Sequence, residues 1–195
     1  MSLCLYELSK NHEAQRKAQE EIDKVLATHQ NINYDMMMDL KYLECCIDET
    51  LRKYPPAPFL IRECSKSYKI PNTELMIAKG TPVIIPLFGL HRDSDIFDDP
   101  LKFIPERFEN SPTGEGKSKG LFYAPFGDGP RVCIGQRMGK LTSKIGLFLL
   151  LSKFNFRCTD ELKKSEVEFS SKQFVLTLKN DINIKVSLRE NKNFY

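Results

Sequence analysis

The stretch "PFGDGPRVCIG", residues 125–135, combines residue types that suit an anionic sulfur. Cys133 stands among three glycines, and glycine lets the backbone approach a flat ligand closely or adopt a positive φ angle. The thiol also lies just before an expected helix, where unpaired amide groups and the helix dipole favour thiolate over thiol. The stretch therefore predicts a cysteine whose sulfur binds a ligand or reacts.

Several uses of this sulfur compete. A phosphatase-type loop needs an arginine that closes around an oxyanion, but Arg137 follows Cys133 at the wrong interval. A P-loop ends in Gly-Lys-Ser/Thr, whereas this stretch ends in Ile134-Gly135-Gln136. A cysteine nucleophile needs a histidine base, and the sequence places none near Cys133. A thiolate ligand to heme iron needs one soft ligand and glycines beside a flat porphyrin. An inert buried thiol is the remaining alternative.

The neighbours of Cys133 favour the heme interpretation. Arg131 lies two residues earlier, and an arginine makes charge-assisted hydrogen bonds to a carboxylate such as a porphyrin propionate. Phe126 lies upstream and either covers the sulfur or packs in the core.

A second group of charged residues predicts a buried ionic cluster. Glu49-Thr-Leu-Arg52 places a carboxylate and a guanidinium on one helix face, where an exposed pair contributes only ~0.2–0.5 kcal/mol. Pro105-Glu-Arg-Phe108 follows downstream, within irregular sequence. We expect Glu49, Arg52 and Arg107 to form a triad that pins this backbone, with a structural and not a catalytic role.

Three segments have the apolar spacing of helices that cover a core. Residues 2–27 predict helix with a break near Asn11, which we expect to act as an N-cap. Residues 40–53 predict a second helix, which Pro55-Pro56 end because proline lacks an amide donor. A third helix is expected over 134–152. The core-facing residues expected in the first segment are Ala14, Ala18, Ile22 and Val25.

The remaining sequence predicts turns, hairpins and irregular backbone. Residues 27–35 are typical of a polar turn, and residues 58–93 of a small sheet built from hairpins. Residues 94–125 predict a long irregular segment, and residues 174–190 a hairpin that turns at Asn180-Asp181. We therefore expect one domain over residues 1–195, mainly α with small β-sheets (α+β).

Composition excludes some classes of function. The net charge of +3 comes from scattered residues, which argues against a nucleic-acid partner. The six cysteines show neither a disulfide framework nor a zinc spacing, which indicates a reducing compartment. The apolar run at 145–151 is too short to cross a bilayer and predicts a buried helix face.

Three motifs together resemble those of cytochrome P450 enzymes. Glu49-Thr-Leu-Arg52 matches the ExxR motif, and Pro105-Glu-Arg-Phe108 matches the PERF motif. Residues 126–135 fit the heme-binding signature FxxGxRxCxG at every defined position. In detail the chain is similar to the microsomal, xenobiotic-oxidising branch of insects and vertebrates, and the resemblance covers nearly all of its length.

The resemblance implies the fold of the C-terminal half of a cytochrome P450 and a site for heme b (iron protoporphyrin IX). Cys133 would be the axial thiolate ligand of the iron, and Arg131 and Arg62 would bind the propionates. The other residues implied at the heme are Pro125, Phe126, Gly127, Val132, Ile134 and Gly135. The residues implied on the substrate side are Ala57, Pro58, Phe59, Leu176 and Thr177. His91 is expected near the heme edge, with a structural role as the stronger alternative.

The implied activity is a monooxygenation of a lipophilic substrate. One atom of O2 enters the substrate, and the electrons come from NADPH–cytochrome P450 reductase, with cytochrome b5 as a further candidate donor. The implied location is the cytosolic face of the endoplasmic reticulum, reached through an N-terminal part. We expect that part, with its oxygen-activating helix, to precede Met1, because the chain begins within a helix. The alternative is a truncated heme-binding fragment without activity. Lys140 and Lys144 are either reductase-docking or solvent-facing residues.

Overall fold

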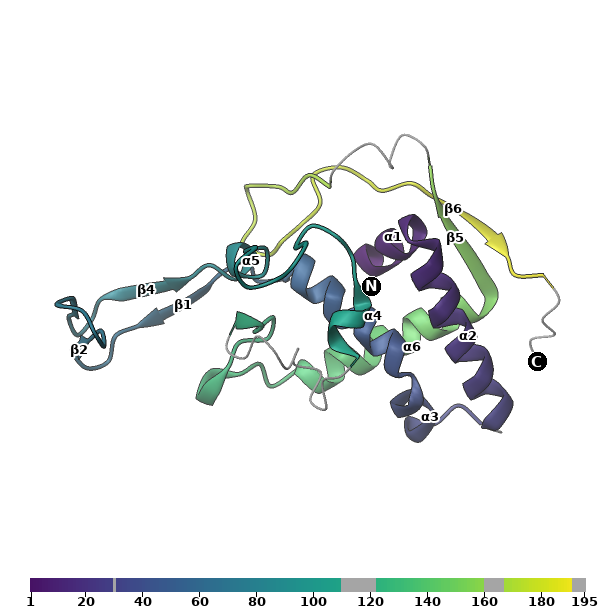
Figure 1. The fold of residues 1–195 in the computed structure, drawn as a ribbon, viewed down its shortest axis with the longest axis horizontal. Coiled ribbons are helices and arrows are strands. Elements are labelled where there is room, and N and C mark those ends of the chain that lie inside the picture. Colours follow the sequence, from purple (N-terminus) through teal and green to yellow (C-terminus); the bar gives the residue numbers. More distant parts are fainter. Residues whose placement is uncertain (30, 110–121, 160–166, 191–195) are drawn as a thin grey trace.

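The computed structural model describes residues 1–29, 31–109, 122–159 and 167–190. Within these ranges the fold is mainly helical with small antiparallel sheets, as the sequence predicts (Figure 1). The α-helices are α1 (Ser2–Lys10), α2 (His12–Thr28), α3 (Tyr34–Asp39), α4 (Lys41–Lys53), α5 (Leu87–Leu90) and α6 (Gln136–Lys153). Two short 3-10 helices, η1 (Pro105–Phe108) and η3 (Gly129–Arg131), flank the undescribed segment that ends at 121.

The core forms where α1, α2, α4 and α6 pack together, on the side of the molecule away from the long hairpin (Figure 1). The apolar face predicted for α2 is buried there, and Ile22 is completely covered. On α6, Leu147 and Leu151 are also completely covered. Ile145 and Leu149 in the same run are exposed, so the predicted buried face holds for only part of the run. Burying side chains of this size stabilises the fold by about 1.5–3 kcal/mol each.

Two local predictions about the first hundred residues hold only in part. The helix break falls at Asn11, which occupies the N-cap position of α2 as expected, but its side chain makes no capping bond there. Its side-chain amide instead donates to the Glu7 carbonyl at the end of α1, at 2.8 Å. The Glu7 carbonyl also accepts from the Asn11 backbone amide at 2.9 Å, so the side chain adds a second donor at the end of α1. The expected polar turn at 27–35 contains the start of α3, because the Asn33 side chain accepts from the Met36 amide at 2.8 Å.

The hairpins predicted over 58–93 are present. Strand β1 (Leu60–Glu63) pairs with β4 (Pro82–Ile85), and between them β2 (Tyr68–Lys69) pairs with β3 (Met76–Ile77). This double hairpin extends away from the helices (Figure 1). After β4 the chain enters α5, which the sequence pattern did not predict.

The prediction of a hairpin over residues 174–190 is wrong. Strand β6 (Ile184–Leu188) pairs with β5 (Phe154–Cys158), which directly follows α6, and Phe156 lies opposite Val186. The backbone groups of residues 174–179 form hydrogen bonds with other segments of the chain. The Leu176 amide donates to the Pro56 carbonyl at 2.8 Å, and the Ser170 amide donates to the Thr177 carbonyl at 2.8 Å.

Candidate heme-binding site

The segment 122–135 forms a closed loop at the start of α6. The Cys133 amide donates to the Phe126 carbonyl at 2.9 Å, and the Gly127 amide donates to the Ala124 carbonyl at 2.9 Å. Gly127 and Gly129 have φ angles of 75° and 70°, which side chains other than that of glycine adopt only with strain. These two glycines therefore fix the path that brings Cys133 out of the loop.

Cys133 presents its thiol at the surface among apolar neighbours. All six cysteines lie in the described ranges; Cys133 is exposed, Cys64 is half-buried and the other four are buried. Ile134 is fully exposed and Val132 is 46% exposed. An accessible sulfur flanked by open apolar side chains suits a flat apolar ligand that needs one soft donor atom.

Strand β1 brings Arg62 to this loop. A Cβ atom placed on Gly127 would lie 3.7 Å from Arg62 Nη2 and 3.7 Å from the Arg131 carbonyl oxygen. Both distances are ordinary van der Waals contacts, so Arg62 packs directly against the loop at Gly127. The loop and the double hairpin therefore meet at Gly127, and two arginines come from two separate elements to one region.

The Glu49–Arg52–Arg107 cluster lies behind the loop and is almost completely buried. Arg52 donates from Nε and Nη2 to the two carboxylate oxygens of Glu49, at 2.7 and 2.9 Å, and both side chains are 0% exposed. Arg107 Nε donates to Glu49 Oε1 at 3.3 Å. The structure thus brings together all three residues that the sequence singled out.

This cluster holds irregular backbone through its remaining donors and acceptors. Arg52 donates to the carbonyls of His91 at 2.6 Å and Pro100 at 2.8 Å. Glu49 Oε1 accepts from the Ile104 amide at 2.9 Å, and Arg107 Nη2 donates to the Asp99 carbonyl at 2.9 Å. Helix α4 therefore anchors the chain between α5 and η1.

Comparison with known proteins decides the family. The family model for cytochrome P450 matches residues 1–186. The chain belongs to the cytochrome P450 family.

Insect proteins are among the similar sequences. The chain is 43% identical over 190 residues to probable cytochrome P450 6d5 of Drosophila melanogaster, covering 97% of this chain and 36% of that protein. It is 43% identical to probable cytochrome P450 6a14 of the same organism, over 95% of this chain and 36% of the relative. Cytochrome P450 6d3 of Musca domestica is 42% identical over 96% of this chain and 36% of its own length. The chain thus spans about a third of the length of these relatives.

The cysteine loop of this P450 chain fits the heme that the family implies. The donor set offers one accessible thiol, and the residues beside it are apolar or glycine. A Cβ atom on Gly135 would lie 3.8 Å from Cys133 Sγ, so the absence of a side chain there keeps one side of the sulfur open. Arg62 and the exposed Arg131 supply cations for two carboxylates.

The residues expected on the substrate side of the P450 site come from two segments that meet. Ala57, Pro58 and Phe59 are half-buried. The Phe59 ring contacts the Phe174 ring edge-on, with centroids 5.2 Å apart, and the Leu176 amide bonds the Pro56 carbonyl. Leu176 and Thr177 therefore lie close to this segment although they do not stand on a hairpin with β6.

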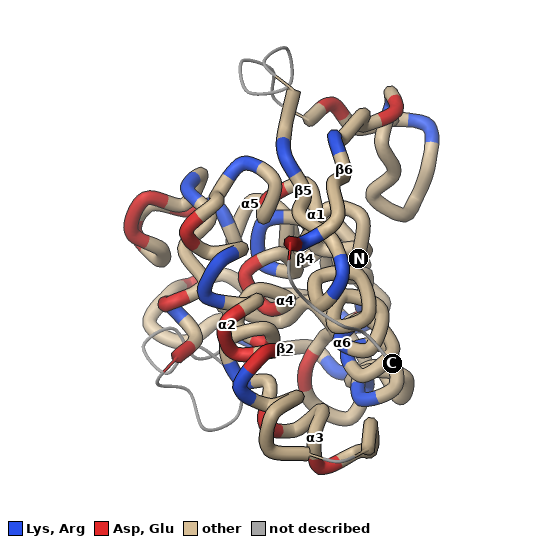
Figure 2. Tube along the Cα trace, turned by 90° about the vertical axis from the view of Figure 1, so that its right-hand side faces the viewer, with Lys and Arg blue, Asp and Glu red and all other residues tan. Residues whose placement is uncertain are grey.

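Neither expectation for Lys140 and Lys144 holds. The Lys144 side chain is 5% exposed and donates to Glu44 at 2.7 Å and to the Met37 carbonyl at 3.1 Å. The Lys140 side chain is 16% exposed and lies 2.6 Å from Asp48 Oδ1. Both lysines join α6 to the inner helices, so neither is a free surface charge for a reductase. Along the described trace, acidic and basic residues are interspersed (Figure 2).

His91 has the structural role that was its stronger alternative. Its ring is fully buried, Nδ1 lies 3.2 Å from the Arg52 carbonyl, and Nε2 accepts from the Ala124 amide at 3.2 Å. His91 thus ties the start of the cysteine loop to α4. The ring must be neutral to accept at Nε2. Burial lowers its pKa from 6.5 to about 4, which agrees with this arrangement.

This lowered pKa predicts acid sensitivity. A histidine whose folded pKa lies below its unfolded value stabilises the fold above pH 6.5, and that contribution is lost as the pH falls towards 4. We expect the loss to reach about 3 kcal/mol. Urea unfolding of wild type and His91→Gln between these pH values checks it. The difference between the two chains should shrink as the pH falls, and a constant difference would contradict the prediction.

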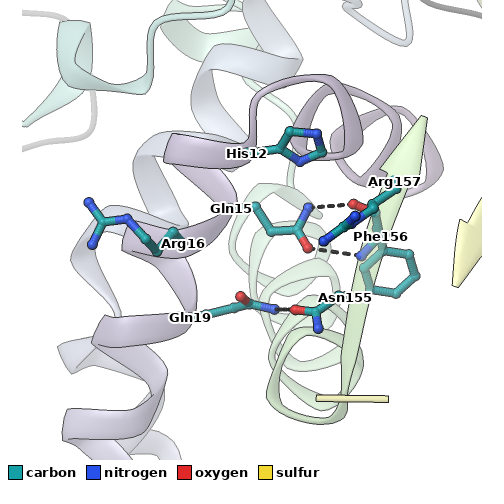
Figure 3. Close-up of a pocket in the computed structure, with 7 residues that line it drawn as sticks. All are labelled: His12, Gln15, Arg16, Gln19, Asn155, Phe156 and Arg157. Atoms are coloured by element: carbon teal, nitrogen blue, oxygen red, sulfur yellow. Dashed lines mark hydrogen bonds between the residues drawn. The ribbon is translucent and has the colours of Figure 1, made fainter. Parts of the chain in front are cut away.

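A cavity of about 450 Å³ lies apart from the cysteine loop, between α2 and β5 (Figure 3). Two of its polar side chains, those of Gln15 and Gln19, bond to β5. Gln15 donates to and accepts from the Phe156 backbone, at 2.8 and 2.9 Å, and Gln19 donates to the Asn155 side chain at 3.1 Å. These bonds hold α2 against β5, and the cavity lies at the contact between the two elements. Among the described helices, none is long and apolar enough to cross a membrane.

Proposed function

We propose that this chain provides the heme-thiolate site of a monooxygenase that acts on a lipophilic organic substrate. The observation that carries the proposal is the accessible Cys133 thiol in a closed glycine loop beside Arg62, in a chain of the cytochrome P450 family. Bound heme would activate O2, with one oxygen atom entering the substrate and the other leaving as water, at the expense of two electrons and two protons.

The residues of this chain would bind and orient the cofactor. Cys133 would supply the thiolate ligand of the iron, whose electron donation would favour the oxygen chemistry that the heme supplies. Arg131 and Arg62 would hold the two propionates. Phe126, Val132 and Ile134 would give an apolar surface that limits water around the sulfur. The remaining contacts with the heme would come from Pro125, Gly127 and Gly135.

The substrate, partners and location also belong to the proposal. Ala57, Pro58 and Phe59 would face the substrate, with Leu176 and Thr177 beside them. Apolar and aromatic side chains at these positions favour a lipophilic molecule. NADPH–cytochrome P450 reductase would deliver electrons, with cytochrome b5 as a further donor. The whole protein would act at the cytosolic face of the endoplasmic reticulum.

The experiment reconstitutes the chain with hemin and the reductase, and supplies NADPH, ¹⁸O₂ and lauric acid, a lipophilic probe whose C–H hydroxylation gives an alcohol that does not exchange its oxygen with water. A product that carries one ¹⁸O atom supports monooxygenation. The matched control is Cys133→Ser, which should give none. Product without ¹⁸O, or equal product from the control, would overturn the proposal.

A second candidate is a heme-binding chain without activity of its own. It is favoured by the share of the relatives' length that the chain spans, 36%. A thiolate-type heme spectrum without any oxygenated product would select this candidate over the first.

A further inference from the structure

A buried carboxylate near the cysteine loop bonds through one of its oxygens to both ends of that loop. The Asp48 side chain on α4 is 1% exposed. Its Oδ1 lies 2.6 Å from Lys140 Nζ and accepts from the Tyr123 hydroxyl at 3.1 Å, while no residue that the structure describes donates to Oδ2. The Tyr123 hydroxyl also lies 3.0 Å from the Asp48 carbonyl oxygen.

The two partners of Asp48 stand on either side of Cys133 in the chain. Tyr123 precedes the loop and is buried, and Lys140 follows it on α6. One carboxylate oxygen therefore connects the entry and the exit of the loop to a single position on α4. The next residue along α4 is Glu49, which anchors the irregular backbone on the other side.

We propose that Asp48 is a positioning residue, whose negative charge holds both ends of the cysteine loop in the arrangement that presents Cys133. This inference rests on the proposed function, in which Cys133 ligates the iron. Asp48 does not touch Cys133 or the reacting atoms. It acts through Tyr123 and Lys140.

The other titratable groups around Asp48 keep a single protonation state near neutral pH. Glu44 lies 2.7 Å from Lys144 and 3.9 Å from Lys140, so it competes for the same cation. Cys45 is a neutral thiol, since burial raises its pKa to about 12. His91 stacks near Tyr123, with ring centroids 5.5 Å apart, and its lowered pKa keeps it neutral.

Two effects act on the Asp48 carboxyl in opposite directions. Burial is the larger effect and raises its pKa, while Lys140 and the Tyr123 hydroxyl lower it. The net result is a pKa raised from 3.8 to about 6. Because the folded pKa lies above the unfolded one, global stability falls as the pH rises from 3.8 to 6. The ionised carboxylate therefore costs global stability at neutral pH.

The local effect has the other sign. If Lys140 and Tyr123 separate from a carboxylate that stays buried, its pKa rises further, because both partners lower it. Protonation therefore favours the loosened loop. A charge that lowers global stability and still orders one segment is suited to positioning. A purely structural residue would instead raise or lower the global stability and the order of the loop together.

The test is hydrogen exchange of the full 195-residue chain, followed by mass spectrometry, with rates corrected for intrinsic pH dependence. At about pH 7.5, Asp48→Asn should exchange ~10-fold faster in peptides covering 122–139. Its thermal unfolding midpoint should be unchanged or ~2–4 °C higher. At about pH 5 the wild-type loop should exchange as fast as that of the variant, because Asp48 is then mostly protonated. These measurements need no heme, so they fail or succeed independently of the proposed function.

Two further variants sharpen the test. Asp23→Asn removes a carboxylate paired with Arg189 at 2.7 Å, away from the loop, and should leave exchange over 122–139 unchanged. Lys140→Met should loosen the loop and also lower the unfolding midpoint, since it leaves a buried carboxylate without its cation. With hemin bound, Asp48→Asn should lower the fraction of thiolate-type spectrum.

Three results would overturn the inference. Wild-type exchange rates over 122–139 in Asp48→Asn would show that the charge does not hold the loop. Faster exchange in every peptide together with a lower unfolding midpoint would show a merely structural role. An Asp48→Asn chain that does not fold at all would lead to the same conclusion, since the carboxylate would then be required for the fold itself.

Discussion

Replacing Cys133 with serine abolishes thiolate-type heme ligation by this chain. A serine hydroxyl is not a soft anionic donor near neutral pH, so hemin would lose its axial sulfur while the loop keeps its backbone path. The expected result is complete loss of the red-shifted Soret band in the reduced, carbon monoxide-bound difference spectrum.

Cys64→Ser is the matched control for this prediction. Cys64 is half-buried near the double hairpin, where its thiol donates to the Lys66 carbonyl at 3.0 Å. The control should keep the thiolate-type band. A red-shifted band of undiminished intensity in Cys133→Ser would show that another group ligates the iron.

The second large effect is expected at Glu49. Its carboxylate accepts two hydrogen bonds from Arg52, one from the Ile104 amide and one from Arg107. Glu49→Ala would leave a fully buried guanidinium without its counter-charge, which typically costs about 3–5 kcal/mol. A domain is stable by only about 5–15 kcal/mol, so this loss removes a large part of that margin and should lower the urea midpoint strongly. Circular dichroism during urea unfolding measures this.

Glu13→Ala provides the comparison for Glu49. Glu13 also pairs with an arginine three residues along its helix, but the Glu13–Arg16 pair is more than half exposed. Its removal should leave the urea midpoint nearly unchanged. Equal midpoints for the two variants would mean that the buried cluster does not anchor the fold.

Local patterns were enough to predict α1, α2, α4, α6 and the motif residues, but not the short helices α3 and α5. The apolar face of α2 follows from spacing alone, and Pro55-Pro56 mark the end of α4 within two residues. The contact of Glu49 with Arg52 follows from helix geometry. Arg107 is distant in the sequence, and its place in the cluster was predicted from the irregular backbone that it had to hold.

Contacts between distant segments were not predictable in the same way. The sequence predicts the segment before Asn180 as the partner of β6, whereas the structure pairs β6 with β5, which packs against the helical core. The roles of Asp48, Tyr123 and Lys140 depend on how α4 and α6 pack, and no short motif encodes that packing. The sequence shows only an aspartate beside the motif glutamate, and periodicity alone does not distinguish a buried residue there from a solvated one.

The most direct test of the central claim is the reduced, carbon monoxide-bound difference spectrum of the purified chain reconstituted with hemin. The claim is that the described residues assemble a heme site with Cys133 as ligand. It predicts a red-shifted Soret band typical of thiolate ligation. A spectrum typical of a neutral ligand or of free heme would contradict it.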